Sequence, residues 1–449
     1  MKQGMSIFLA LSYIIMTFSQ PVWFQWLVSF TVFTFILISI PSLKGMTAKL
    51  MGGLAALTIL LLIGQEKWIN IIISGALVNL TIVAIFVLTP ILGIPFRTGG
   101  YIESLRSILY KKRNSASFFY ISIALLTHLL GAVINVGAIS INYYLSSASN
   151  VKSNRLIANA LNRGFAGAVA WSPYFAAMAL VISQLHIKWT SIALYAIGFS
   201  LLSFLVGFLL EGKVIKREEE RLSEIETGEE AVPILPGTRR ILFELISLLF
   251  VTTGTVLLIE HFTFVNMIVS IGFTALFFPA IWCCFKGTIP LYKEEVKKHI
   301  MITLPNLNQE ISLFLLAGLF SSAFVASEWS GMLVGAFSSM FGHSPVMMTI
   351  ILSIIIVGTA MGGLHPIVVV TILITSIKPS DLNFSIHYFA IALLGSWSIS
   401  NVLSPATAVN NLIAYSLREK LINIAIRWNW IYGFIMVILL PFYLYLAGL

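Results

Sequence analysis

Long runs of apolar residues alternate with short polar segments along the whole chain. Uninterrupted runs lie near residues 4–19, 22–40, 50–64, 69–92, 190–210, 241–259, 263–285, 307–327 and 428–448. Apolar runs of roughly 20 residues match the hydrocarbon thickness of a bilayer when they form α-helices. A helix also satisfies its own backbone hydrogen bonds inside lipid. The pattern therefore predicts an all-α polytopic membrane protein.

Two further apolar segments, 157–183 and 385–416, are interrupted by polar residues and a proline. Each contains a Ser-Pro pair, Ser172-Pro173 in the first and Ser404-Pro405 in the second. Proline removes one helical hydrogen bond and frees a carbonyl, which lipid cannot satisfy. We therefore expect two broken transmembrane helices that line a cavity.

Two other long segments have small and polar residues at their centres. Residues 117–148 contain Asn135 and Gly137, and residues 345–377 contain Gly362, Gly363 and His365 followed by proline. Each segment has enough apolar length for two short helices and a turn between them. We interpret both as re-entrant hairpins, which return to the side of the membrane from which they enter.

The positions of basic residues test this topology. If the N-terminus is inside, most of the 27 Lys and Arg residues fall on the cytoplasmic side. This holds only if both hairpins return to their own side. The charge distribution predicts about 11 transmembrane helices, with the N-terminus inside and the C-terminus outside.

The same order of elements occurs twice in this topology, with opposite orientation. Three spans, an interfacial connector (95–116 or 328–343), a hairpin and a broken helix make up each copy. The predicted divisions are a first helix at 1–21, repeat 1 at 22–210, a solvated cytoplasmic linker at 211–240, repeat 2 at 241–427, and a last helix at 428–449. Inverted repeats of this kind place a site near the bilayer midplane.

Composition supports the membrane interpretation and excludes other classes. The chain is 58% hydrophobic and 10% charged, which no soluble fold of this length tolerates. Its net charge of +9 resides in the loops, so it indicates insertion topology rather than nucleic-acid binding. Cys283 and Cys284 are adjacent, so neither an ordinary disulfide nor a metal site is expected.

The four interruptions supply the candidate site. The residues that we expect to bind substrate or ion are Asn135, Gly137, Asn162, Ser172, Pro173, Gly362, Gly363, His365, Asn401, Ser404, Pro405 and Thr407. Hydroxyls and freed carbonyls suit a hard monovalent cation, and we expect Na⁺ near Asn135, Ser172, Asn401 and Ser404. The N-termini of half-helices favour an anion. No other cofactor is expected.

Charged residues near these breaks are few. Glu244, Glu260, Glu310 and Glu328 all sit at the ends of predicted spans, so proton coupling through a carboxylate is disfavoured. Arg163 has two interpretations, because it is placed either to neutralise an anionic substrate or to reach the cytoplasmic interface.

Two histidines also lie in the interrupted segments. His128 and His365 are placed either to bind substrate or to hydrogen-bond a carbonyl that the break leaves free. Both interpretations stay open at the level of the sequence.

Five segments resemble the ion transporter superfamily, nearest to its arsenite-permease and citrate-transporter branch. They are TGGYIESLRSILYKKRN, LLTHLLGAVINVGAISINYYL, ANALNRGFAGAVAWSPYFAAMAL, NQEISLFLLAGLFSSAFVASEWSGML and SNVLSPATAVNNLIA. The resemblance implies scaffold and transport bundles, elevator-type motion, a homodimer, and cation-coupled movement of small anions.

We therefore expect a secondary active transporter that moves a small anionic solute across the cytoplasmic membrane, with Na⁺ favoured over H⁺ as the coupling ion. The alternatives are a cation/proton antiporter, a metalloid efflux permease and a channel. An intramembrane enzyme with Ser172 or Ser404 as nucleophile is disfavoured, because the chain has no GxSxG or HExxH motif and no obvious catalytic base.

Overall fold

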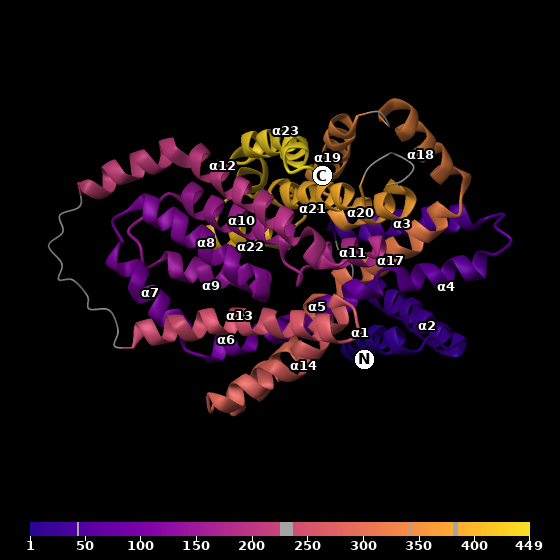
Figure 1. The fold of residues 1–449 in the computed structure, drawn as a ribbon, viewed down its shortest axis with the longest axis horizontal. Coiled ribbons are helices and arrows are strands. Elements are labelled where there is room, and N and C mark those ends of the chain that lie inside the picture. The colour runs from indigo at the N-terminus through magenta and orange to yellow at the C-terminus, as the bar shows by residue number, and fades with distance from the viewer. Residues whose placement is uncertain (43–44, 225–236, 342–343, 380–384) are drawn as a thin grey trace.

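The computed structural model describes residues 1–42, 45–224, 237–341, 344–379 and 385–449, and its regular elements there are all helices (Figure 1). The first half contains α1 (Lys2–Phe18), α2 (Val22–Ser39), α3 (Gly45–Leu62), α4 (Trp68–Val78), α5 (Leu80–Leu92), α6 (Ile94–Thr98), α7 (Tyr101–Lys111), α8 (Ala116–Ile134), α9 (Gly137–Ser146), α10 (Asn154–Trp171), α11 (Ala176–Leu185) and α12 (Trp189–Ser223).

The second half is also helical in its described residues. It contains α13 (Thr238–Phe262), α14 (Met267–Phe285), α15 (Ile289–Lys298), the π-helix η2 (His299–Thr303), α16 (Leu304–Asn306), α17 (Asn308–Val325), α18 (Glu328–Phe341), α19 (Pro345–Met361), α20 (Pro366–Ser376), α21 (Ile386–Leu403), α22 (Ala408–Leu417), the π-helix η4 (Asn423–Arg427) and α23 (Trp430–Leu446).

The predicted fold class, an all-α polytopic membrane protein, is confirmed. In the described part of the chain, 9 helical stretches are long and apolar enough to cross a membrane. Shorter apolar helices accompany them, including α1, α19, α20 and α23. Many large apolar side chains on the outer surface are exposed, among them Phe250 at 75% and Leu201 at 66%. Such a surface fits contact with lipid rather than water.

The predicted span at 69–92 is two helices rather than one. It breaks at Asn79, whose buried side-chain amide donates a hydrogen bond of 2.8 Å to the carbonyl of Phe314 in α17. Just before the break, α4 lies so close to α17 that a Cβ on Gly75 would be 2.9 Å from the Cα of Leu319. This close packing explains why glycine occupies position 75.

The predicted linker at 211–240 begins too early. Helix α12 continues to Ser223, so residues 211–223 belong to it, and Glu211 is completely buried. Residues 225–236 of this prediction lie outside the described residues. Charged residues in this helix are buried because they form ion pairs with α10, which the sequence pattern did not indicate.

Helices α8 and α9 form an antiparallel pair that breaks at Asn135. Asn135 has a left-handed φ of 58°, which reverses the chain direction. At the other end, the backbone N–H of Asn150, after α9, donates to the carbonyl of Arg113, before α8, at 3.0 Å. The segment therefore returns to the place where it began. Helices α19 and α20 also pack against each other, across a break at 362–365.

The two broken helices have the same local structure. In each broken helix, a serine side chain caps the N-terminus of the first helical half, and a second serine follows its last residue. The second helical half ends at a residue in the left-handed conformation, with φ of 52°. The equivalent pairs are Ser153 and Ser385, Ser172 and Ser404, and His186 and Arg418. Helices α10 and α21 pack against each other near the centre of the molecule (Figure 1).

Candidate functional site

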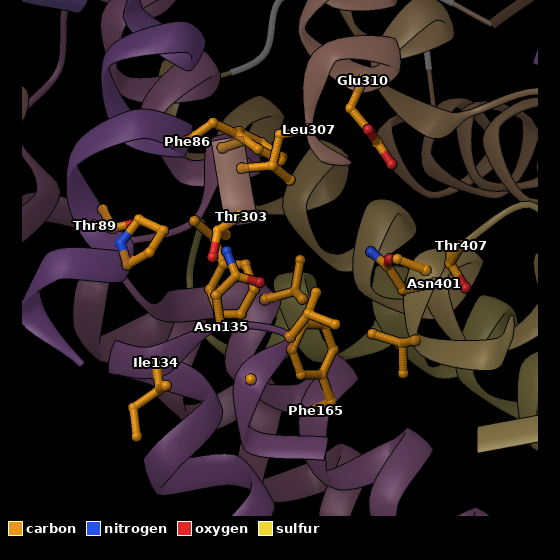
Figure 2. A pocket seen from close by; sticks show the side chains of 18 of the residues that line it. Phe86, Thr89, Ile134, Asn135, Phe165, Thr303, Leu307, Glu310, Asn401 and Thr407 are labelled. Carbon is orange, nitrogen blue, oxygen red and sulfur yellow. The ribbon is translucent and has the colours of Figure 1, made fainter. Parts of the chain in front are cut away.

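A cavity of about 550 Å³ lies where the interrupted helices meet (Figure 2). Its walls come from both halves of the chain, including α5, α8, α9, α10, α11, α17, α21 and α22. Most of the lining is apolar, and the aromatic side chains in it are Phe86, Phe165, Phe175, Phe314 and Trp397. A few polar groups face this apolar surface, an arrangement typical of small-molecule sites.

Four helices begin at the cavity wall. The first residues of α9 (Gly137), α11 (Ala176 and Ala177) and α22 (Ala408 and Val409) line it, as does the residue that precedes α20 (His365). The first N–H groups of any helix have no acceptor within that helix. They also carry the positive end of the helix dipole. The cavity is therefore surrounded by partial positive charge from the backbone.

Five of the predicted site residues line the cavity: Asn135, Gly137, His365, Asn401 and Thr407. The Asn135 side chain makes no hydrogen bond to any described residue, so its amide is available to a ligand. Asn401 donates from Nδ2 to the carbonyl of Trp397 at 3.1 Å, which leaves Oδ1 available. The Nδ1 atom of His365 accepts from the N–H of Ile367 at 3.2 Å.

The other predicted residues lie behind the wall. Both serines of the Ser-Pro pairs are fully buried. Ser172 Oγ donates to the carbonyl of Ala132 at 2.6 Å, and Ser404 Oγ accepts from the N–H of Ala406 at 3.2 Å. Residues Asn162, Pro173, Gly362, Gly363 and Pro405 likewise do not line the cavity described above. The two serines stabilise the breaks and do not face a ligand.

The carbonyls freed at the second break are largely occupied by asparagine side chains. Asn410 Nδ2 lies 3.1 Å from the carbonyl of Asn401, 3.0 Å from that of Val402 and 2.9 Å from that of Ser404. Asn162 donates to Val402 as well, at 3.1 Å. These contacts leave fewer carbonyl ligands for Na⁺ than the sequence suggested. The only feature of the sequence that could have indicated this role of Asn410 was its position about one helical turn after the break.

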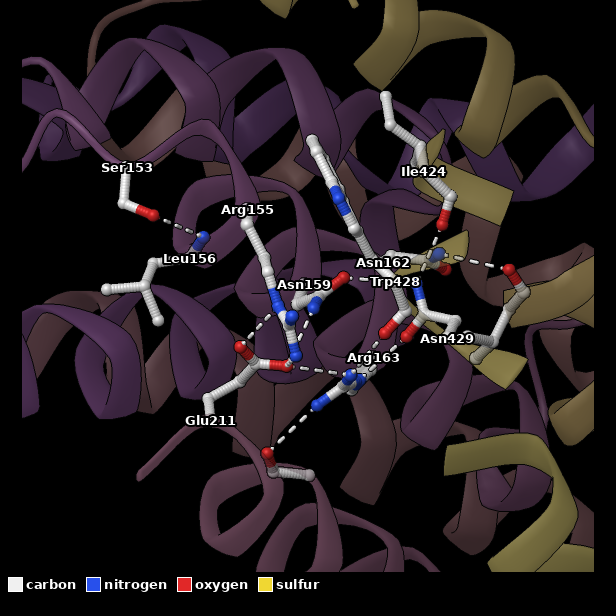
Figure 3. A network of polar contacts seen from close by, with 12 residues as sticks. Ser153, Arg155, Leu156, Asn159, Asn162, Arg163, Glu211, Ile424, Trp428 and Asn429 are labelled. Atoms are coloured by element: carbon white, nitrogen blue, oxygen red, sulfur yellow. Dashed lines mark hydrogen bonds and ion pairs between the residues drawn. The ribbon is translucent and has the colours of Figure 1, made fainter. Parts of the chain in front are cut away.

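Arg163 is held in a buried network away from the cavity (Figure 3). Its guanidinium donates to Asn429 Oδ1 at 2.8 Å, to the carbonyl of Gly207 at 2.9 Å and to Glu211 Oε1 at 3.0 Å. The guanidinium also lies over the ring of Tyr432, 4.8 Å from its centroid. Arg163 therefore ties α10 to α12 and to the C-terminal helices, and it does not line the cavity.

His128 also serves packing. Its Nε2 accepts a hydrogen bond of 2.9 Å from Trp171 Nε1, between α8 and α10. The indole of Trp189 donates in turn to the carbonyl of Trp171 at 2.7 Å. This chain of contacts supports the first broken helix from behind, and His128 does not line the cavity.

Charged side chains from α6 and α15 line one end of the cavity. Arg97 Nε lies 2.7 Å from Glu295 Oε2, and Lys298 Nζ lies 3.4 Å from Glu295 Oε1. The Lys298 side chain is 59% exposed, so this end reaches the surface. Burial raises the pKa of Glu295, but the hydrogen bond and charge of Arg97 outweigh it, and the pKa lies below its usual value.

Glu310 lines the cavity, although the sequence indicated only that it sits at the end of a predicted span. It lies in the first turn of α17, and its side chain faces the space bounded by Asn401 and Thr407 (Figure 2). Its Oε2 atom is buried and has no hydrogen-bond partner among the described residues. The cavity lining includes Phe314, one turn after Glu310, whose ring lies against His365, so this end of α17 belongs to the site.

The described part of the chain is all-helical and encloses a cavity of mostly apolar lining with a few polar groups. The crystal structure of the YdaH transporter from Alcanivorax borkumensis, a protein described as having an unusual topology, is similar to this chain with a TM-score of 0.57. The match covers 94% of this chain and 98% of that one at 14% sequence identity. Neither a protein-family model nor a curated protein sequence matches the chain. The similarity therefore concerns the fold.

Proposed function

We propose that this protein is a secondary active transporter that moves a small organic anion across the cytoplasmic membrane. The observation that carries this proposal is the meeting of four helix N-termini at one cavity. Three of them, those of α9, α11 and α22, offer N–H groups, whereas α20 begins with Pro366 and its next two N–H groups are bonded to His365. Helix N-termini bind anions through free N–H groups and the helix dipole. Anion binding of this kind needs no unpaired arginine, which agrees with the engagement of Arg163 elsewhere and with the pairing of Arg97 with Glu295.

The lining of the cavity also indicates what the remainder of the solute would be like. Aromatic and aliphatic side chains such as Phe165, Phe314 and Trp397 form most of the wall. They would contact an apolar body, while the helix N-termini would bind a carboxylate or a similar group. The amide of Asn135 and the Oδ1 of Asn401 would orient it. A compact organic anion with an aromatic or aliphatic portion fits this division better than an inorganic oxyanion.

Alternating access is supported by the repeated local structure of α10–α11 and α21–α22. We propose that these helices belong to an inverted repeat, with the N-terminus of the chain inside and the C-terminus outside. The exposed end of the cavity carries Arg97 and Lys298, and basic residues favour the cytoplasmic side. The structure would then be the inward-facing state. Elevator-type motion and a homodimer are part of the same proposal.

Binding of anions to the purified full-length protein tests the proposal. Sodium and potassium salts of benzoate, citrate and phosphate would be compared by thermal shift, because a ligand of the folded state raises its apparent stability. We expect benzoate to stabilise the protein more than phosphate does. Transport of the stabilising anion would then be measured in proteoliposomes, with and without a Na⁺ or proton gradient.

The Ala408 position provides a matched pair of variants. Ala408 lines the cavity in the first turn of α22 and is exposed there. Ala408→Asp adds a negative charge beside the helix N-termini and should abolish anion binding through repulsion. Ala408→Asn has nearly the same size without the charge and should retain most of the binding. Equal anion affinity in the two variants would contradict the proposed site.

A further inference from the structure

We propose that Glu310 is the cation-binding residue of this cavity, and that its carboxylate takes up a monovalent cation, either a proton or Na⁺. The assignment of this cation as the coupling ion rests on the proposed function. Cation binding itself does not, because it follows from the environment of the carboxylate alone.

The first observation is the missing partner of the carboxylate. Glu310 Oε2 is buried and unbonded among the residues that the structure describes. The carboxylate interacts with its own backbone N–H. Glu310 as a whole is half-buried, but a carboxylate oxygen that is buried without a partner is costly, because burial removes its hydration. Such a group is stabilised when it binds a proton or a metal cation.

The second observation is the absence of compensating charge on the helices around α17. Helices α2, α4, α5 and α16 pack against α17 and contain no Asp, Glu, Lys, Arg or His. Helix α3 contributes Lys49, which is exposed, and α18 contributes Glu328, at the opposite end of α17. On α1, Lys2 donates to Ser42 Oγ at 3.1 Å.

The remaining titratable groups are those of the cavity itself. His365 stands at the start of α20 with its Nδ1 bonded to Ile367 and its ring against Phe314. Arg97 and Lys298 both pair with Glu295, and His299 Nε2 lies 2.8 Å from the carbonyl of Val87. None of these groups forms an ion pair with Glu310 in the described part of the chain.

Oxygen atoms suitable for a cation lie in the same cavity. Asn401 Oδ1 is free of described partners and lies across the cavity from Glu310 (Figure 2). Thr407 also lines the cavity, and its Oγ1 donates to the carbonyl of Ser404 and accepts from the N–H of Asn410. Carboxylate, amide and hydroxyl oxygens are hard ligands. Asn401 and Thr407 belong to the second broken helix, so a cation on Glu310 would connect α17 to α21 and α22.

The position of Glu310 explains how the cation and the anion would be coupled. The anion-binding helix N-termini and Glu310 line one cavity. An anion without a cation would meet the negative carboxylate, whereas a bound cation would remove that repulsion. Each ligand would therefore raise the affinity for the other, and such coupling is reciprocal.

Two measurements on purified full-length protein test the proposal with cations alone. Thermal stability is compared in NaCl and in choline chloride at equal ionic strength and pH. The infrared spectrum is examined for the band of a protonated carboxylic acid. Wild type is compared with Glu310→Gln, and with Glu328→Gln as the control, because Glu328 is an exposed acid on α18.

A carboxylic acid band that Glu310→Gln lacks would identify a proton on Glu310. Stabilisation by Na⁺ in wild type and in Glu328→Gln, but not in Glu310→Gln, would identify Na⁺. If Glu310→Gln matched wild type in both measurements, the proposal would be overturned. If that variant does not fold, Glu310→Ala replaces it, and an unchanged band and Na⁺ response would overturn the proposal. The outcome is independent of whether any anion binds.

Discussion

Ser398 of α21 donates a hydrogen bond of 2.6 Å to the backbone carbonyl of Ala166 in α10, and the two residues are 232 positions apart. The same separation relates Ser172 to Ser404 at the two breaks, and His186 to Arg418 at the ends of the two second halves. The two broken helices therefore touch at equivalent positions. A contact of this kind is expected where two copies of a repeat cross near an axis of approximate symmetry.

Loss of Arg163 should strongly destabilise the protein. Arg163→Leu leaves the fully buried Glu211 with Arg155 as its remaining cationic partner, and breaking a buried ion pair costs about 3–5 kcal/mol. Thermal unfolding of the purified variants would measure this. Arg155→Leu serves as the control, because Arg155 pairs with the same carboxylate but is 38% exposed, so we expect a smaller loss. Equal losses would contradict the structural role of Arg163.

Asn410 should matter more than its neighbour Asn411. Asn410→Ala removes the donor that faces three carbonyls at the second break, and each buried acceptor left unsatisfied costs about 1–3 kcal/mol. Asn411 donates to Pro405 and Thr407 but is exposed, so water replaces its amide in Asn411→Ala. The apparent unfolding temperatures of the two variants would be compared. A larger loss in Asn411→Ala would be incompatible with this assignment.

Cysteine labelling tests the topology. In a background with Cys283→Ser and Cys284→Ser, Lys112→Cys should react from the cytoplasmic side and Lys378→Cys from the outside, because an inverted repeat places the open ends of the two hairpins on opposite sides. Membrane-impermeant thiol reagents applied to either side would show this. Ser172→Cys is the buried control and should stay unlabelled. Labelling of both hairpin positions from the same side would reject the inverted repeat.

The Arg97–Glu295 pair predicts a dependence of stability on pH. Burial raises the pKa of Glu295 in the folded state, but the hydrogen bond and positive charge of Arg97 lower it by more, so the net shift is downward. The pair therefore stabilises the fold above the unfolded-state pKa of glutamate, and this contribution disappears as the pH falls through the folded-state value. Thermal unfolding as a function of pH should show a weaker acid-induced loss in Arg97→Gln than in wild type. The same acid-induced loss in both would show that the pair contributes nothing.

Arg106→Gln is the control for that comparison. Arg106 lies 4.0 Å from Glu103 in an exposed pair, where solvent screens the interaction. Its substitution should leave the pH dependence of unfolding close to that of wild type.

The polar residues of α21 show how far local sequence reasoning extends to a site. Clustered serines and asparagines marked residues 385–416 as unusual, and the structure has its break there. Most of these groups bond to the protein, however. Ser396 pairs with Ser353 of α19, Ser398 with Ala166, and Ser400 with Trp397. Only Asn401 and Thr407 of the predicted residues in this segment face the cavity.

The sequence by itself determined the all-helical membrane fold and indicated where the long segments break, because hydrophobicity, glycine and proline act within a few residues along the chain. Only the tertiary structure decided which polar groups meet in the cavity. Glu310 was predicted at a span end, Arg97 in an interfacial connector and Glu295 in a loop between two spans, yet all three line the cavity. Arg163 instead binds partners that are distant in the sequence, such as Asn429. The direction in which such a side chain points depends on the packing of helices distant in sequence, which no local pattern encodes.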